Sequence, residues 1–175
     1  MRHLLSGAAV LSLLVTVPGH AQGSTTWLPE GTALGVTVDR FDVEDFGLLA
    51  GTFHVSSLKP HHLTPEFAVS IFPQALAASA LAANVDVGGA FNLPLPRATL
   101  LLRAGLSGLF IAGAGGGGAL PGVHYGASLL VKIAGKNGIR FDVVARRAVY
   151  PPYGVSPAFL SFGAGITSIP GVHSE

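Results

Sequence analysis

Apolar and polar positions alternate along this chain with a period of two residues. The clearest example is residues 139–146, in which an apolar set alternates with a mainly polar set: Ile139, Phe141, Val143 and Ala145 against Arg140, Asp142, Val144 and Arg146. This period predicts a β-strand with one apolar face and one polar face. Lys136-Asn137-Gly138 precedes the run. Asn-Gly between two alternating runs predicts a hairpin whose type I′ turn has positive φ at both central residues.

Eight such runs follow one another, each of roughly 7 to 12 residues, close to the 9–11 that a tilted membrane-crossing strand needs. They span residues 32–39, 47–57, 66–72, 84–91, 99–110, 123–133, 139–146 and 160–167. Eight is an even number and the smallest usual count for a single-chain outer-membrane barrel. The pattern therefore predicts an all-β fold, an eight-stranded antiparallel up-and-down transmembrane β-barrel.

The segments between the runs predict the connections. The charge-rich residues 40–45 are expected to form a solvated loop, residues 92–96 a stiff proline-containing connection, and residues 115–118 a flexible glycine loop. The Ala-rich residues 74–83 fit either a short helix or an apolar loop. The connections after the second, fourth and sixth runs are expected to be compact. Those after the first, third and fifth runs are expected to be longer, and the connection after the seventh run is expected to be short. Short periplasmic turns and longer outer loops are typical of outer-membrane barrels.

The N-terminus resembles an export signal. Arg2 and His3 precede the apolar run Leu4–Val17, and small residues lead to an expected cut after Ala21. The alternative is a membrane anchor, but a run of about 14 residues is shorter than the roughly 20 that a spanning helix needs. We therefore expect a cleaved signal peptide at residues 1–21 and an outer-membrane β-barrel domain at residues 22–175.

Composition supports a membrane location and excludes several other classes. The 175 residues are 49% hydrophobic and 11% charged, whereas an average domain is about 25% charged. With 10 Lys and Arg against 9 Asp and Glu, the chain has no basic surface for nucleic acid. It has no cysteine, which excludes disulfides, thiolate metal sites and a thiol nucleophile. Later apolar runs are all interrupted by Gly, Pro or charge, so crossing lipid would require a closed barrel.

With these features the chain resembles the small eight-stranded outer-membrane β-barrel proteins of Gram-negative bacteria, the OmpA-like and OmpX-like barrels. The export signal, the eight alternating runs and the inner-face glycines carry the resemblance. It implies location in the bacterial outer membrane, with outer-membrane lipids and the barrel-assembly machinery as partners. The sequence departs from that family at its last strand, which ends in Ile166-Thr167-Ser168-Ile169 instead of an aromatic residue.

The predicted inner face carries most of the strand charges. These are Asp39, Asp86, Asp142, Arg103, Lys132, Arg140 and Arg146. An eight-stranded barrel is just wide enough for its own side chains, and buried charges must be paired. We expect a salt-bridged, filled interior; the alternative is a charged pore or a ligand pocket.

Three motifs are candidate sites of chemistry. His54-Val55-Ser56 resembles the His-x-Ser pair of an outer-membrane lipid A deacylase, with Glu66 as the nearby carboxylate, but the alternation places the pair inside the barrel. His61-His62 could ligate a metal, although neighbouring strand residues point to opposite faces. Gly115–Gly118 lacks the Lys-Ser/Thr ending of a phosphate loop. We therefore assign no catalytic, cofactor-binding or metal residues and expect no cofactor.

The sequence thus predicts a non-enzymatic outer-membrane barrel with a structural or surface-interaction role and a surface ligand, if any, unknown. The main alternative is a soluble exported lipocalin-like barrel that binds an apolar ligand inside. A minor alternative is an outer-membrane lipid-modifying hydrolase. Alternation alone does not separate inside from outside. The polar face favours the membrane barrel, because a water-exposed surface is roughly a quarter or more charged and this face is mainly Gly, Ser and Thr.

Overall fold

The computed structural model describes residues 30–43, 46–149 and 158–169. The predicted signal peptide at residues 1–21 lies outside the described residues, so its cleavage stays a prediction.

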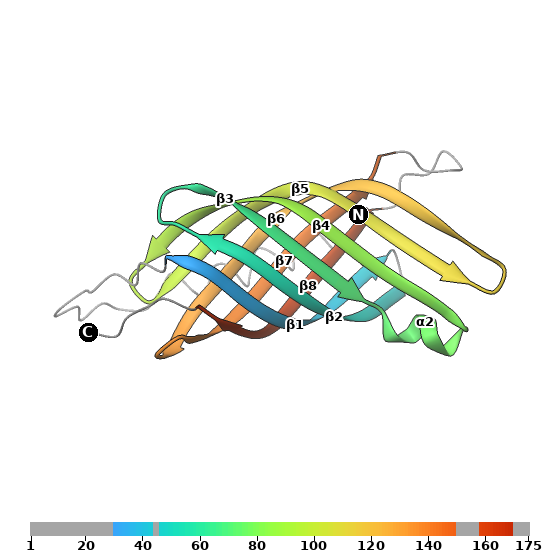
Figure 1. Ribbon diagram of the computed structural model, residues 1–175, viewed down its shortest axis with the longest axis horizontal. Helices are drawn as coiled ribbons and strands as arrows, with labels where there is room; N and C mark the ends of the chain where they lie inside the picture. The colour runs from blue at the N-terminus through green and yellow to red at the C-terminus, as the bar shows by residue number, and fades with distance from the viewer. Residues whose placement is uncertain (1–29, 44–45, 150–157, 170–175) are drawn as a thin grey trace, which may run out of the picture.

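Eight antiparallel strands form a closed barrel in which each strand pairs with its neighbours along the chain (Figure 1). The strands are β1 (Gly31–Val43), β2 (Phe46–Leu58), β3 (Leu63–Ile71), β4 (Ala80–Leu95), β5 (Ala98–Gly113), β6 (Gly116–Ala134), β7 (Asn137–Ala148) and β8 (Ala158–Ser168). Pairing of β1 with β8, from Leu34↔Ser168 to Asp42↔Leu160, closes the sheet. The predicted all-β, eight-stranded up-and-down fold is confirmed.

The two faces of the sheet are as the alternation predicts. Each strand exposes a large apolar side chain on the outside of the barrel, as in the series Val36, Phe53, Phe67, Val87, Leu102, Tyr125, Phe141 and Phe162. Each strand also buries a polar side chain on the inside, as in the series Asp39, His54, Glu66, Asp86, Arg103, Ser128, Arg140 and Ser161. A lipocalin-like barrel has the opposite orientation, so the structure disfavours that alternative.

The strands are longer than the sequence pattern indicates. Residues 40–43 continue β1 instead of forming a loop, and Phe41 is buried. Residues 92–95 continue β4, where Pro94 pairs with Thr99 close to the turn. Residues 116–118 belong to β6 and pair with residues 111–113 of β5, so they are not a loop. These three expectations were wrong because neighbouring strands supply pairing partners that local composition does not reveal.

The turn between β6 and β7 lies before Asn137-Gly138 in the chain. Both of these residues already belong to β7, and the positive φ lies at Gly135 (+54°). The register shifts between Lys132 and Ala134, which marks a bulge. The predicted hairpin is present, but Gly135 supplies the left-handed conformation.

The two ends of the barrel differ. One end carries the β2–β3, β4–β5 and β6–β7 turns, and we call it the turn end. The other end carries the helix α2 (Pro73–Ala77) and the projecting β5–β6 hairpin, and we call it the α2 end (Figure 1). No helix in the described part of the chain is long and apolar enough to cross a membrane.

The connections only partly follow the predicted lengths. At the α2 end, just two residues separate β1 from β2 and β5 from β6, so the expectation of longer loops there was wrong. The connection after β7 lies almost entirely at residues 150–157, outside the described residues, so the expectation for it stays a prediction. A short helix forms within 74–83, one of the two predicted possibilities.

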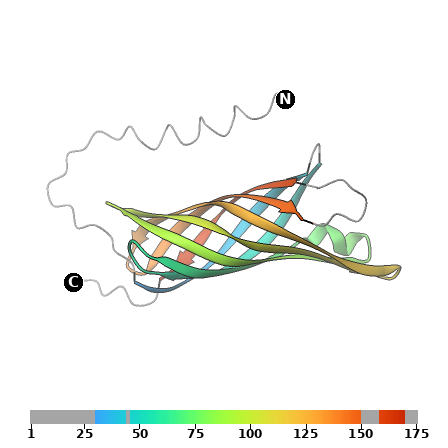
Figure 2. The ribbon, with the colours of Figure 1, turned by 90° about the horizontal axis from the view of Figure 1, so that it is seen from above.

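The interior has three layers of side chains along the barrel axis. This axis lies near the horizontal in Figure 2. At the turn end lies a buried apolar cluster, made of Ala33, Leu58, Ala90, Leu101, Leu130 and Ile169. At the α2 end a second apolar cluster contains Phe41, Ala50 and Phe72. The charged side chains lie between the two clusters. Because the alternation marks only inside and outside, it did not predict these layers.

Candidate functional site

Arg140 is the centre of the buried polar layer, and it is fully buried. Its Nε donates to both carboxylate oxygens of Asp142, at 2.9 and 3.0 Å. Its Nη2 donates to Glu66 Oε1 at 2.7 Å and to Ser128 Oγ at 3.0 Å. Its Nη1 donates to Ser56 Oγ at 3.1 Å. One guanidinium thus joins strands β2, β3, β6 and β7 across the lumen.

Arg103 supplies a second cation to the same two carboxylates. Its Nε lies 3.2 Å from Glu66 Oε2, and its Nη1 lies 3.4 Å from Asp142 Oδ1. Ser128 also donates to Asp142. Two arginines and two carboxylates therefore form a compact neutral group, which compensates the desolvation that isolated buried charges would suffer.

A second ion pair lies nearer the α2 end. Arg146 donates from Nη2 to Asp86 Oδ2 at 2.6 Å and from Nη1 to Ser161 Oγ at 2.6 Å. Asn84 donates to Asp86 at 2.9 Å. The Arg146 guanidinium also lies 4.7 Å from the centre of the Phe41 ring, a cation–π contact. The Arg146–Asp86 pair is thus the part of the charged layer that lies next to the apolar α2 end.

Asp39 is held by hydroxyl groups. Thr37 Oγ1 donates to Oδ1 at 2.8 Å, and Thr52 Oγ1 donates to Oδ2 at 2.5 Å. His54 Nε2 lies 2.9 Å from Thr37 Oγ1 and 3.6 Å from Asp142 Oδ2. The histidine therefore links the Asp39 group to the Arg140 group.

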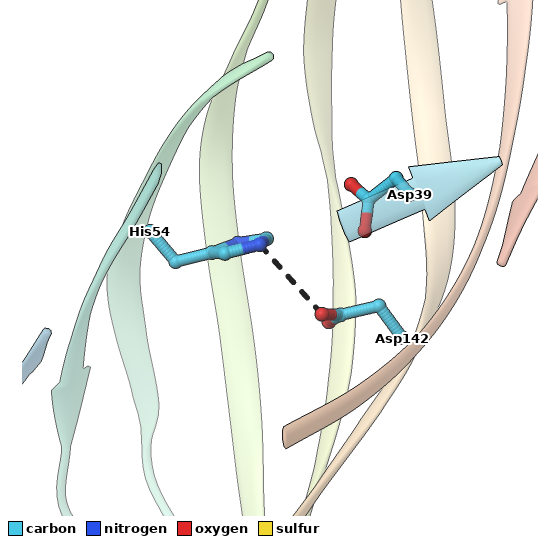
Figure 3. A group of neighbouring side chains, drawn as sticks. All are labelled: Asp39, His54 and Asp142. Carbon is cyan, nitrogen blue, oxygen red and sulfur yellow. Dashed lines mark ion pairs between the residues drawn. The ribbon is translucent and has the colours of Figure 1, made fainter. Parts of the chain in front are cut away.

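Asp39, His54 and Asp142 bring potential metal ligands within 4.8 Å of one another (Figure 3). The sequence did not predict this grouping, because the three residues lie on β1, β2 and β7. The carboxylates already accept hydrogen bonds from protein groups: Asp39 from Thr37 and Thr52, and Asp142 from Arg140. An adjacent arginine opposes a bound cation, so the arrangement fits an ion-pair network better than a metal site.

The His54-Ser56-Glu66 constellation does not have the geometry of a hydrolase. Ser56 Oγ donates to Glu66 Oε1 at 3.1 Å and accepts from Arg140, whereas His54 is directed towards Thr37. A nucleophilic serine needs its hydroxyl on the histidine base. All three residues are buried in the lumen, as the alternation predicts for His54 and Ser56. His61 and His62, the other histidine pair, are exposed in the β2–β3 turn.

Six of the seven predicted lumenal charges are buried inside the barrel: Asp39, Asp86, Asp142, Arg103, Arg140 and Arg146. The placement of Lys132 was wrong, because this residue is exposed where β6 ends in its bulge. Glu66 was missed as a lumenal charge, although it shares the inward phase of Ala68 and Ser70 in the same run. The described lumen thus holds three arginines, four carboxylates and two histidines, instead of four cations and three anions.

The α2 end contains a cavity of about 300 Å³. Its wall is largely apolar and comes from inward positions of five strands together with α2. The lining residues are Phe41, Leu48, Phe72, Gln74, Ala75, Ala82, Asn84, Leu109, Ile111 and Phe159. Sequence reasoning missed this cavity because its residues come from six separate elements.

Comparison with known proteins identifies the fold. No protein-family model matches the sequence, and neither does any curated protein. Among solved structures, the N-terminal β-barrel domain of Pseudomonas aeruginosa OprF aligns with a TM-score of 0.55 at 9% identity, over 79% of this chain and 98% of that one. Neisserial surface protein A aligns with a TM-score of 0.55 at 7% identity, over 79% and 95%. The chain therefore has the fold of small eight-stranded outer-membrane barrels.

Proposed function

We propose that this chain is a non-enzymatic outer-membrane β-barrel protein, exported by a signal peptide at residues 1–21, with a structural or surface-interaction role. The observation that carries the proposal is the inverted distribution of polarity. Large apolar side chains cover the outside of every strand, while arginines and carboxylates are buried inside. Such an exterior suits lipid and not water. The fold shared with OprF and Neisserial surface protein A supports the same location.

The α2 end is proposed to face the cell exterior. The chain enters β1 and leaves β8 at the turn end, alongside the β2–β3, β4–β5 and β6–β7 turns. In outer-membrane barrels the compact turns are periplasmic and the longer connections are extracellular. The helix α2 and the projecting β5–β6 hairpin would then be available for contacts at the cell surface. The proposed partners inside the cell envelope are outer-membrane lipids and the barrel-assembly machinery.

The interior is proposed to be closed. Two observations support this: residues of the charged layer are nearly all less than 5% exposed, and a buried apolar cluster lies at the turn end. The expected result in a planar lipid bilayer is therefore the absence of discrete channel openings from the wild-type protein. Stable, ion-selective openings would contradict the closed interior and favour a charged pore.

Membrane fractionation and site-specific labelling test location and orientation. We expect the full-length protein in the outer-membrane fraction, with a gel mobility that changes on boiling. The chain has no cysteine, so single cysteines can be labelled without background. A membrane-impermeant maleimide should label Leu76→Cys on α2 in intact cells, and Lys59→Cys in the β2–β3 turn only after the outer membrane is opened. A periplasmic product, or the reverse labelling pattern, would contradict the proposal.

A further inference from the structure

Paired backbone bounds the cavity at the α2 end on two sides. Phe41 of β1 pairs with Leu48 of β2, and Ala82 of β4 pairs with Ile111 of β5. Strand β3 ends at Ile71, before it reaches the cavity. Beyond that point α2 forms the wall between β2 and β4. These walls separate the cavity from the surrounding lipid on those sides, so a ligand would enter through the end of the barrel.

The helix is fixed to the open edge of β2 by one side chain. The side-chain NH₂ of Gln74 donates to Leu49 O at 2.7 Å, and its side-chain oxygen accepts from Leu49 N at 3.0 Å. It thereby takes the place of a neighbouring strand. Phe72 precedes the helix, is buried, and packs against Phe41 with ring centres 4.8 Å apart. The cavity is thus built by defined contacts of α2.

The polar groups of the wall already have partners. Asn84 donates to Asp86 and accepts from Ser107 Oγ at 3.0 Å, and Gln74 is bonded to the β2 backbone. Arg146, whose guanidinium lies over the ring of the lining residue Phe41, is neutralised by Asp86. No charged side chain lines the cavity among the described residues. A ligand with a charged or strongly hydrogen-bonding group would lose its hydration without compensation there.

We propose that this cavity binds a small, uncharged hydrocarbon that enters from the extracellular side. An apolar cavity of roughly 150 Å³ stays dry and accepts benzene. The cavity here, of about 300 Å³, is twice that size. It suits a two-ring aromatic molecule or an aliphatic chain of similar volume. The rings of Phe41, Phe72 and Phe159 favour the aromatic ligand through edge-to-face contacts.

This proposal is tested by methyl NMR of the whole mature protein, residues 22–175, in lipid nanodiscs titrated with naphthalene. Methyl groups of Ala82, Leu109 and Ile111 line the cavity and should shift saturably. Leu102 and Leu106 are exposed on the lipid-facing surface and should shift weakly and linearly, as the probe partitions into lipid. Shifts that fail to saturate at the cavity methyls would overturn the proposal.

Two cavity-filling variants and one matched control complete the test. Ala82→Phe places a ring in the cavity and should weaken naphthalene binding at least tenfold. Ala104→Phe introduces the same ring on the exposed outer face of β5 and should change the affinity less than twofold. If Ala82→Phe does not fold, Ala75→Leu on α2 should weaken binding in the same direction. Unchanged affinity in the folded cavity variant would overturn the proposal.

The same spectra distinguish the other occupants. Nuclear Overhauser contacts between lipid methylenes and the cavity methyls, without added probe, would show that a membrane acyl chain fills the cavity. Contacts from residues 150–157 to those methyls, together with absence of naphthalene binding, would show that the protein's own connection fills it. Either result would overturn the proposal of a free hydrocarbon ligand and leave the proposed membrane location intact.

Discussion

Replacing Arg140 with methionine should strongly destabilise the barrel. The substitution removes five hydrogen bonds to Asp142, Glu66, Ser56 and Ser128. It leaves two buried carboxylates with Arg103 as their remaining arginine, at 3.2 and 3.4 Å. Removing one partner of a buried ion pair costs about 3–5 kcal/mol, because the other charge stays desolvated. We therefore expect the free energy of unfolding to fall by about that amount.

Urea unfolding in lipid vesicles measures this loss, with the folded fraction read from gel mobility without boiling. For a urea dependence of about 1–3 kcal/mol per molar, the midpoint should fall by roughly 2 M. Arg40→Met is the matched control. Arg40 forms a 2.7 Å ion pair with Asp42, but its side chain is 65% exposed, so solvent weakens the pair. Its loss should cost no more than about 1 kcal/mol.

A compensated variant separates the lost charge balance from lost packing. Arg140→Met combined with Glu66→Gln removes one cation and one carboxylate charge, and it leaves Arg103 and Asp142 as a neutral pair 3.4 Å apart. Because no buried charge then lacks a partner, this double variant should recover part of the lost midpoint. The reasoning would be refuted if Arg140→Met matched Arg40→Met, or if the double variant were less stable than Arg140→Met alone.

Three further outcomes are expected. Gly88→Ala should lower the urea midpoint, because an added Cβ would collide with the β5 backbone at Ala104 and Gly105, whereas Gly51→Ala, where a Cβ meets open space, should leave it unchanged. Gln74→Ala should cost about 1 kcal/mol and speed amide exchange at Leu49, since it removes both bonds between α2 and β2; unchanged exchange would contradict this role. Intact-mass measurement of the exported protein should show cleavage after Ala21, and an uncleaved chain would contradict the signal peptide.

The alternation predicted which side chains face inward almost without error, because a closed sheet permits only two faces. His54, Arg103 and Asp142 lie where the two-residue period places them. Composition then decided which face was internal: few charges on the polar face meant that it could not cover a water-exposed barrel. The structure confirms this choice for every strand. Periodicity and composition together were therefore sufficient for the architecture.

The ends of the strands were harder to predict, because pairing there depends on distant partners. Arg40 lies in a charge-rich segment, yet β8 pairs with that segment and extends β1. Gly117 and Gly118 have little strand propensity, but Ala112 and Ile111 of β5 provide their register. The same dependence explains why Lys132 is exposed. The alternation predicts that its side chain points inward, but the residue lies where β6 leaves the barrel. Local sequence contains none of this tertiary information.

The layered interior assigns different roles to the two ends. Apolar side chains at the turn end exclude water from one side of the charge network, and Phe41 covers Arg146 on the other. Ion pairs are stronger when water is excluded, and unpaired charges are correspondingly more costly. The middle layer therefore joins several strands across the lumen through buried ion pairs. The space left for a ligand lies above it, next to α2, on the side that the proposed orientation places outside the cell.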